Sequence, residues 1–224
     1  MPSRQTILSI GEIYHVYNRG NAARDVFLSN IDYERFLKTM SFYRFKFPSF
    51  SLSKFLTLSS DKQKASFTKL ETKSECLVEI FCFCLMPNHF HFLLKQVSEV
   101  GVSKFVGQLQ NSYTRYFNTK KNRVGALFQG QFKAKRVVSE RQLIHLSRYI
   151  HLNPYSSFLI KSIDGLSEYN YSSFSDYVNK RGFDFINKKY IIDIFGGMET
   201  YKKFVFDQAN YQRELSMIKS LIIE

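Results

Sequence analysis

The chain has 224 residues, of which 44% are hydrophobic and 17% aromatic. This content is enough to bury the core of a folded domain, so a disordered or fibrous protein is excluded. The net charge of +13 indicates an acidic partner, either nucleic acid or an anionic membrane surface.

A nucleic acid is the better of these two partners. The longest apolar stretch, IFCFCLM, is far shorter than the roughly 20 residues that a membrane helix needs. The N-terminus has no apolar segment of the kind found in signal peptides. Three cysteines, an odd number, are typical of a reducing compartment. We therefore expect a cytoplasmic protein that does not act at a membrane.

The first part of the chain predicts a strand, a helix and an insertion. Residues 13–20, IYHVYNRG, are rich in β-branched and aromatic residues and stop at a glycine, which is typical of a strand. Residues 30–46 have apolar side chains at helical spacing behind Asn30 as the N-cap. Residues 47–74 are rich in serine and lysine and only partly periodic, so we expect an insertion with a short helix.

A hairpin, a helix and a further strand are predicted next. Residues 75–86 and 89–97 are two strand-like runs joined by the turn dipeptide Pro-Asn. Residues 102–121 have a helical period, and residues 126–138 follow as a strand.

The last predicted core element is the helix ERQLIHLSRYIHLN. Ser139 is its N-cap, and Pro154 should end it, because the residue before a proline is pushed out of the α region. The resulting order predicts an α+β protein, a ferredoxin-like split βαβ with an antiparallel sheet and an added C-terminal helix. We expect residues 1–158 to form one domain, with the insertion at about 47–74, and residues 159–224 to form a helical extension that docks on it.

The first candidate site is the histidine pair in CLMPNHFHFLL. Residues two apart on a strand point to the same face, so His89 and His91 project together, away from Phe90 and Phe92. Two imidazoles are half of a metal site and need a third ligand to hold an ion. The alternative is a pair of ordinary histidines on a half-exposed sheet face.

Cys82 and Cys84 on the partner strand are one source of further ligands. Cys-x-Cys followed by His-x-His is a tetrahedral zinc set by residue type. A two-residue turn would place Cys84 opposite His91 on the same face, whereas a three-residue loop would turn the cysteines away. Free cysteines also pack as small hydrophobic side chains, so a buried pair without metal is the other interpretation.

A second source lies in LSRYIHLNPY. Tyr149 and Asn153 are four residues apart on the predicted helix and so share one face. An amide oxygen is a hard ligand, and two histidines with one asparagine suit Mg²⁺ or Mn²⁺ better than zinc. A tyrosine on an amphipathic helix is also an ordinary core residue, and position alone favours that interpretation.

The charge distribution favours an anionic ligand. No acidic residue lies between Glu99 and Glu140, although lysines and arginines are frequent there. A solvated surface normally mixes both signs. Aromatic residues alternate with cations in NSYTRYFNTKKNR, a mixture typical of proteins that bind single strands by base stacking and phosphate contacts. DNA or RNA is therefore the expected partner.

Together these segments resemble a known family. YHVYNRGN, LMPNHFHFLLK, QNSYTRYFN, LFQGQFK and LSRYIHLNPY occur in the order seen in REP-associated tyrosine transposases, relatives of the single-strand insertion-sequence transposases with a histidine-hydrophobic-histidine (HUH) motif. The resemblance covers about residues 11–158. Several linked motifs are more specific than an isolated His-x-His.

The resemblance implies a metal-dependent single-stranded DNA endonuclease and strand transferase that acts beside hairpins of imperfect palindromes. It implies that His89 and His91 are metal ligands, with Asn153 as the third where some relatives carry glutamine, and that the ion is Mg²⁺ or Mn²⁺. Tyr149 would be the nucleophile that forms a 5′-phosphotyrosine. His151 departs from the spacing of that face and should point away from Tyr149.

Seven further residues are candidates for holding the DNA. They are Asn18, Arg19, Arg115, Tyr116, Lys133, Lys135 and Arg136. The alternative function is a non-catalytic regulator that binds hairpin DNA or RNA on the same scaffold. Relatives include monomers and dimers that swap the tyrosine helix, and the short KRVVSE link before that helix favours a monomer over a homodimer.

Overall fold

The computed structural model describes residues 7–46, 50–73, 75–178 and 181–222, so small parts of the predicted insertion and of both chain ends lie outside it. Within these ranges the chain forms a four-stranded antiparallel sheet in the order β2-β3-β1-β4. The strands are β1 (Ile13–Arg19), β2 (Val78–Met86), β3 (His89–Gln96) and β4 (Lys133–Val137). This order, with a helix between β1 and β2 and another between β3 and β4, confirms the predicted ferredoxin-like arrangement.

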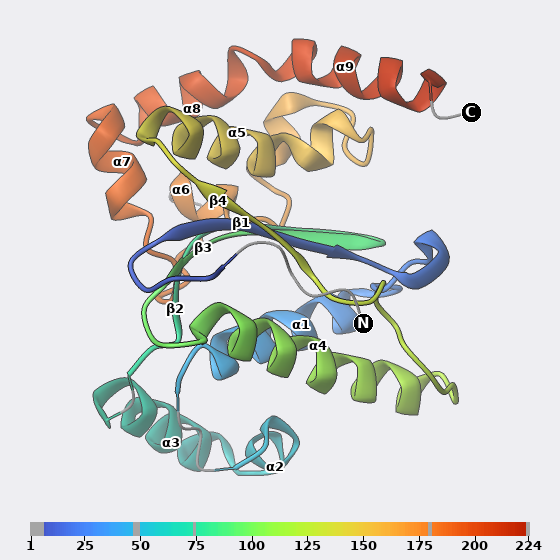
Figure 1. Ribbon diagram of the computed structural model, residues 1–224, viewed down its shortest axis with the longest axis vertical. Helices are drawn as coiled ribbons and strands as arrows, with labels where there is room; N and C mark the ends of the chain where they lie inside the picture. The colour runs from blue at the N-terminus through green and yellow to red at the C-terminus, as the bar shows by residue number, and fades with distance from the viewer. Residues whose placement is uncertain (1–6, 47–49, 74, 179–180, 223–224) are drawn as a thin grey trace.

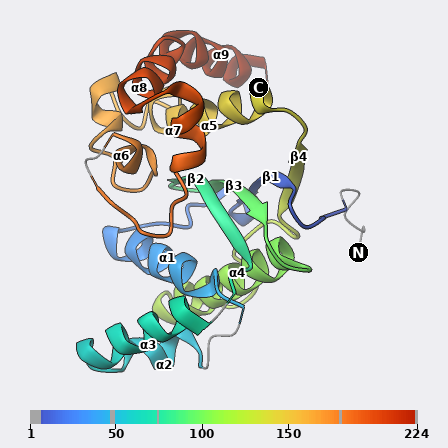
Figure 2. The same cartoon turned by 90° about the vertical axis from the view of Figure 1, so that its left-hand side faces the viewer.

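Helices cover both faces of the sheet (Figures 1 and 2). One face packs against α1 (Asn30–Tyr43) and α4 (Gly101–Lys120), and α5 (Glu140–Ser156) packs against the other. The other helices are α2 (Leu52–Leu56), α3 (Ser60–Lys73), α6 (Phe174–Tyr177), α7 (Lys189–Phe195), α8 (Met198–Phe206) and α9 (Ala209–Ile222), with short 3₁₀ turns η1 (Asn21–Ala23) and η2 (Ile163–Leu166). No helix in the described ranges is long and apolar enough to cross a membrane.

Alternation along β3 gives the sheet two chemically different faces. Phe90 and Phe92 point toward α1, where their ring centroids lie 5.6 and 6.3 Å from that of Phe36. All three phenylalanines are fully buried, and burying an aromatic side chain of this size stabilises the fold by about 2 to 3 kcal/mol. The opposite face of β3 presents His89 and His91 toward α5.

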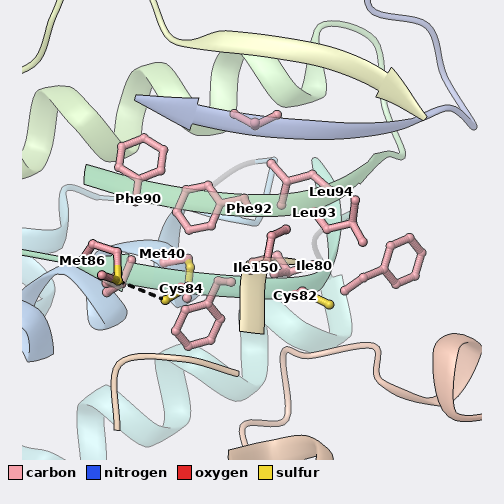
Figure 3. Close-up of a cluster of buried hydrophobic side chains, with 14 of the residues drawn as sticks. Met40, Ile80, Cys82, Cys84, Met86, Phe90, Phe92, Leu93, Leu94 and Ile150 are labelled. Carbon is pink, nitrogen blue, oxygen red and sulfur yellow. Dashed lines mark hydrogen bonds between the residues drawn. The ribbon is translucent and has the colours of Figure 1, made fainter. Parts of the chain in front are cut away.

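The turn between β2 and β3 fixes the register of the hairpin. Cys84 pairs with His91, as a two-residue turn predicts, and a bulge between Ile80 and Cys82 brings Cys82 opposite Leu93. Both cysteines are fully buried among apolar side chains (Figure 3). The register therefore places the thiols on the histidine face, but inside the core.

The tyrosine helix α5 starts as predicted and ends later. Ser139 accepts a hydrogen bond from the Gln142 backbone N–H at 3.1 Å, and the Gln142 side chain accepts one from the Val138 N–H at 2.8 Å. The prediction that Pro154 ends the helix is wrong, since α5 continues to Ser156. The last turn stays helical despite the proline because it is buried. Pro154 is itself buried, and Tyr155 packs against α9.

The predicted strand at residues 126–138 is also shorter than expected. Only residues 133–137 pair with β1. Gly130 adopts a φ of +45°, in the left-handed region that interrupts an extended chain. The preceding segment touches the sheet at one isolated bridge, between Gly20 and Phe128.

Residues beyond α5 pack back on it through a buried polar network. His151 places Nδ1 2.7 Å from the Tyr201 hydroxyl and Nε2 2.8 Å from Ser173 Oγ. The Tyr201 hydroxyl donates to Ser147 Oγ at 3.0 Å, which ties α8 to α5. His151 therefore points away from Tyr149, as expected. The division into a domain at 1–158 and an extension at 159–224 stays a prediction.

Candidate metal and tyrosine site

His89, His91 and Tyr149 come together on the α5 face of the sheet. The two histidine rings lie edge to face with centroids 5.1 Å apart. The Tyr149 ring stands edge-on to His91 with centroids 5.6 Å apart, and the Tyr149 side chain remains 38% exposed. A phenol beside an imidazole pair, with access from solvent, is an arrangement that allows attack on a bound phosphodiester.

A third histidine, His15, completes the cluster. Tyr17 pairs with His91 across β1 and β3, so His15, two residues earlier, projects on the same face. His15 Nε2 lies 2.9 Å from His91 Nδ1, and its ring centroid is 6.1 Å from that of Tyr149. His15 is not among the predicted site residues, because alternation places it on a face of the sheet but only the register between two distant strands decides which residue lies next to it.

Burial keeps these imidazoles neutral. It lowers the pKa of His15 and of His89 to about 4, with smaller contributions from the cations Lys135 and Arg19. The pKa of His91 falls well below its usual value, first through burial and then through its two histidine neighbours. A neutral imidazole has a lone pair for a metal, so His89 and His91 are better suited to bind a divalent ion than protonated histidines would be.

Tyr149 is a protonated phenol at neutral pH. Burial raises the pKa of its hydroxyl above the ordinary value, and the nearby amide of Asn153 offsets this only in part. The hydroxyl therefore needs help to lose its proton during an attack.

Asn153 lies one helical turn after Tyr149 on α5 and is 7% exposed. Its amide nitrogen donates to the Tyr149 backbone carbonyl at 2.8 Å. This contact orients the amide and leaves its oxygen as the remaining acceptor. Among the described residues, no three His, Cys, Asp or Glu side chains group as a metal site, so a third protein ligand would have to be of another type, such as this amide. Its role as a ligand stays a prediction.

The alternative zinc set does not form. Cys82 Sγ contacts the Tyr177 hydroxyl at 3.6 Å. Cys84 Sγ contacts Met86 Sδ, also at 3.6 Å (Figure 3). Burial raises the pKa of the Cys82 thiol to about 12 and that of Cys84 still further, so both remain protonated. Because zinc binds the thiolate, this pair behaves as the small hydrophobic core residues of the second interpretation.

Several predicted DNA-binding residues lie around a pocket of about 380 Å³ next to His89. Asn18, Arg19 and Lys133 line it together with Tyr17 and His89. Lys133 Nζ lies 5.9 Å from the Tyr17 ring centroid. Asn18 is buried, and its Nδ2 has no hydrogen-bond partner among the described residues. The pocket thus combines two cations with a free amide donor.

Lys135 also lies on the face of the sheet toward α5, since it pairs with His15 across β1 and β4. Arg136 faces the other way and makes two hydrogen bonds to the Glu12 carboxylate, at 2.5 and 2.7 Å. Its charge is therefore already compensated within the protein.

Arg115 and Tyr116 lie on the far side of the sheet. They line a separate pocket of about 590 Å³ along α1 and α4. The Tyr116 hydroxyl donates to Asp32 at 2.9 Å. Tyr113 and Phe117, which alternate with the cations in the sequence, are buried core residues, so the expectation that they stack on bases is wrong.

Two comparisons with known proteins give a similarity. Residues 53–153 match the family model described as IS200-like transposase. This part of the chain is therefore similar to the IS200-like transposases.

The structure also resembles a solved REP-associated tyrosine transposase bound to a REP hairpin, with a TM-score of 0.52 and 14% identity. The alignment covers 80% of this chain and 87% of the other. At this identity the likeness establishes the shared fold. No curated protein sequence matches the chain.

Proposed function

We propose that the protein is a metal-dependent single-stranded DNA endonuclease and strand transferase, a transposase that acts at DNA hairpins. The observation that carries the proposal is the contact of a solvent-accessible tyrosine, Tyr149, with a cluster of neutral histidines. The similarity of residues 53–153 to the IS200-like transposases supports a DNA-processing reaction.

His89, His91 and the amide oxygen of Asn153 are the proposed ligands of Mg²⁺ or Mn²⁺. An ion bound there would polarise the scissile phosphate and stabilise negative charge on its oxygens. The neutral state of both imidazoles favours this ligand set, and because the Asn153 amide nitrogen donates to the Tyr149 carbonyl, the amide oxygen is the atom left to act as a ligand.

Tyr149 is the proposed nucleophile. Its phenolic oxygen attacks phosphorus, the bond from phosphorus to the 3′ oxygen breaks, and the phenolic proton is lost as the departing oxygen gains one. The products are a 5′-phosphotyrosine and a free 3′-hydroxyl. Attack by another 3′-hydroxyl reverses the step and joins two strands, because the phosphoester bond energy is retained.

The proposed substrate is single-stranded DNA beside a hairpin. The similar solved protein is bound to a REP hairpin, and the cations beside His89 and His15 support contact with a phosphate backbone. Asn18, Arg19, Lys133 and Lys135 would hold the strand that reaches Tyr149. Arg115, Tyr116 and Arg136 would have to contact another part of the DNA.

A second candidate function is a non-catalytic regulator that binds hairpin DNA or RNA. The raised pKa of the Tyr149 hydroxyl favours it, since the phenol is a poor nucleophile as it stands. The two functions differ in one observable product, the covalent adduct.

The test uses hairpin oligonucleotides labelled at the 5′ or the 3′ end, with and without Mn²⁺, resolved on denaturing gels. We expect a metal-dependent covalent band that keeps only the 3′-side label and is lost in Tyr149→Phe. Tyr211→Phe is the matched control, because Tyr211 is an exposed tyrosine on α9. Tight binding without an adduct would instead support the regulator.

A further inference from the structure

The protonation of His89 is fixed by its neighbour in the turn, Asn88. His89 Nδ1 lies 2.6 Å from Asn88 Oδ1. The Asn88 amide nitrogen donates to the Ala23 carbonyl at 3.2 Å, so the side-chain oxygen is the atom that faces the histidine. An amide oxygen only accepts hydrogen bonds, so a neutral His89 carries its proton on Nδ1 and its lone pair on Nε2.

His91 also contacts another side chain through Nδ1, in this case the imidazole of His15. The 2.9 Å contact joins His91 Nδ1 and His15 Nε2. One of the two nitrogens must donate. If His91 donates, its Nε2 keeps a lone pair; if His15 donates, His91 carries its proton on Nε2 and has no free lone pair.

We propose that Asn88 and His15 are positioning residues that hold His89 and His91 as Nδ1–H tautomers, so that both present Nε2 to a metal. Metal-bound histidines commonly donate their other ring nitrogen to an acceptor, which fixes the ring and increases its basicity. The metal part of this inference rests on the proposed function. The tautomers are a property of the protein alone.

His145 on α5 is an internal reference for the other tautomer, which carries its proton on Nε2. Its Nδ1 lies 2.8 Å from Arg148 Nη2. A guanidinium only donates, so a neutral His145 accepts at Nδ1 and carries its proton on Nε2. The proposal therefore expects both tautomers in the same protein, at different histidines.

The tautomers are measured on metal-free protein labelled with ¹⁵N-histidine, from long-range proton–nitrogen correlations at neutral pH. We expect His89 and His91 to be protonated on Nδ1 and His145 on Nε2. Single histidine replacements assign the signals. Protonation of His91 on Nε2 would overturn the role of His15, and protonation of His89 on Nε2 would overturn that of Asn88.

Two pairs of variants distinguish the effect of each hydrogen bond on Mn²⁺ affinity from the effect of side-chain packing. His15→Gln keeps an acceptor near His91 and His15→Leu removes it, while Asn88→Asp keeps an acceptor beside His89 and Asn88→Ala removes it. We expect the Leu and Ala variants to bind Mn²⁺ about 10- to 100-fold more weakly in calorimetric titrations, with the Gln and Asp variants within a few-fold of the wild type.

The outcomes distinguish this inference from the proposed function. The expected tautomers and Mn²⁺ affinities without a DNA adduct would reject the transposase chemistry alone. An adduct in the wild type, with equal Mn²⁺ affinity in folded His15→Leu and His15→Gln, would reject the positioning role of His15 alone. Amide spectra of each variant show whether that variant has folded. The tautomer measurement on the wild-type protein tests the proposal even if a variant does not fold.

Discussion

The two faces of the central sheet are made by alternating residues of the same strands, yet they differ in chemistry. The face toward α1 and α4 presents Phe90 and Phe92 to an apolar core. The face toward α5 presents His89 and His91, which are satisfied by side chains from the turn and from β1. The comparison shows that one strand can supply stability from one side and a reactive site from the other.

The largest expected effect is a loss of stability when a residue is changed on the face of the sheet that packs against α1 and α4. Phe92→Ala should lower the free energy of unfolding by about 3 to 5 kcal/mol, because it removes a fully buried ring and leaves a cavity. Urea unfolding measures the change. Mn²⁺ affinity of the folded fraction should remain within a few-fold. A loss below 1 kcal/mol would show that the core does not depend on this face.

The next largest expected effect is the loss of Mn²⁺ affinity in His89→Ala, on the face of the sheet toward α5. Removing one of two imidazole ligands should weaken Mn²⁺ binding by about 100-fold, which corresponds to about 2.7 kcal/mol. The free energy of unfolding should change far less than in Phe92→Ala, since His89 is only partly buried. Calorimetric titration and urea unfolding measure both. Unchanged Mn²⁺ affinity would remove His89 from the metal site.

Tyr201→Phe tests the polar layer behind the tyrosine helix. The change deletes the hydroxyl that contacts both His151 and Ser147, leaving buried polar groups without a partner. We expect a loss of about 1 to 3 kcal/mol in thermal or urea unfolding. The exposed Tyr211→Phe is the control and should change stability by less than about 0.5 kcal/mol. Equal effects in the two variants would mean that the network does not stabilise α5.

The smallest expected effect is on DNA binding. Lys133→Gln removes a cation from the pocket beside His89, and should reduce the salt dependence of single-strand binding by about one phosphate contact. Fluorescence anisotropy at several salt concentrations measures the slope. Lys202→Gln on α8 is the matched control. An equal reduction in the control would mean that the pocket does not bind the strand.

Local patterns predicted the elements that carry the site, since each leaves a signal in neighbouring residues. The β-branched and aromatic residues at 13–20 and the strand-like run at 89–97 predicted β1 and β3. The turn length was left open between two and three residues, and the observed pairing of Cys84 with His91 is the one that a two-residue turn gives. Helical spacing and the Ser139 cap predicted the start of α5. From these, the shared face of His89 and His91 followed.

Contacts between distant segments could not be predicted in this way. The approach of His15 to His91 depends on how β1 and β3 are aligned, and the Arg136 pairing with Glu12 depends on a neighbouring strand. Tyr113 has the polar and charged neighbours of a surface residue, but helix packing buries it. Such contacts depend on tertiary structure, which residue spacing does not encode.

The most direct test of the central claim is to locate the DNA adduct by mass spectrometry after digestion of the protein and the nucleic acid. The peptide at residues 149–161 contains two tyrosines, the 38% exposed Tyr149 and the 7% exposed Tyr155. The account predicts a phosphate linked to Tyr149 in the presence of Mn²⁺. A phosphate on Tyr155 or on any other residue would contradict it.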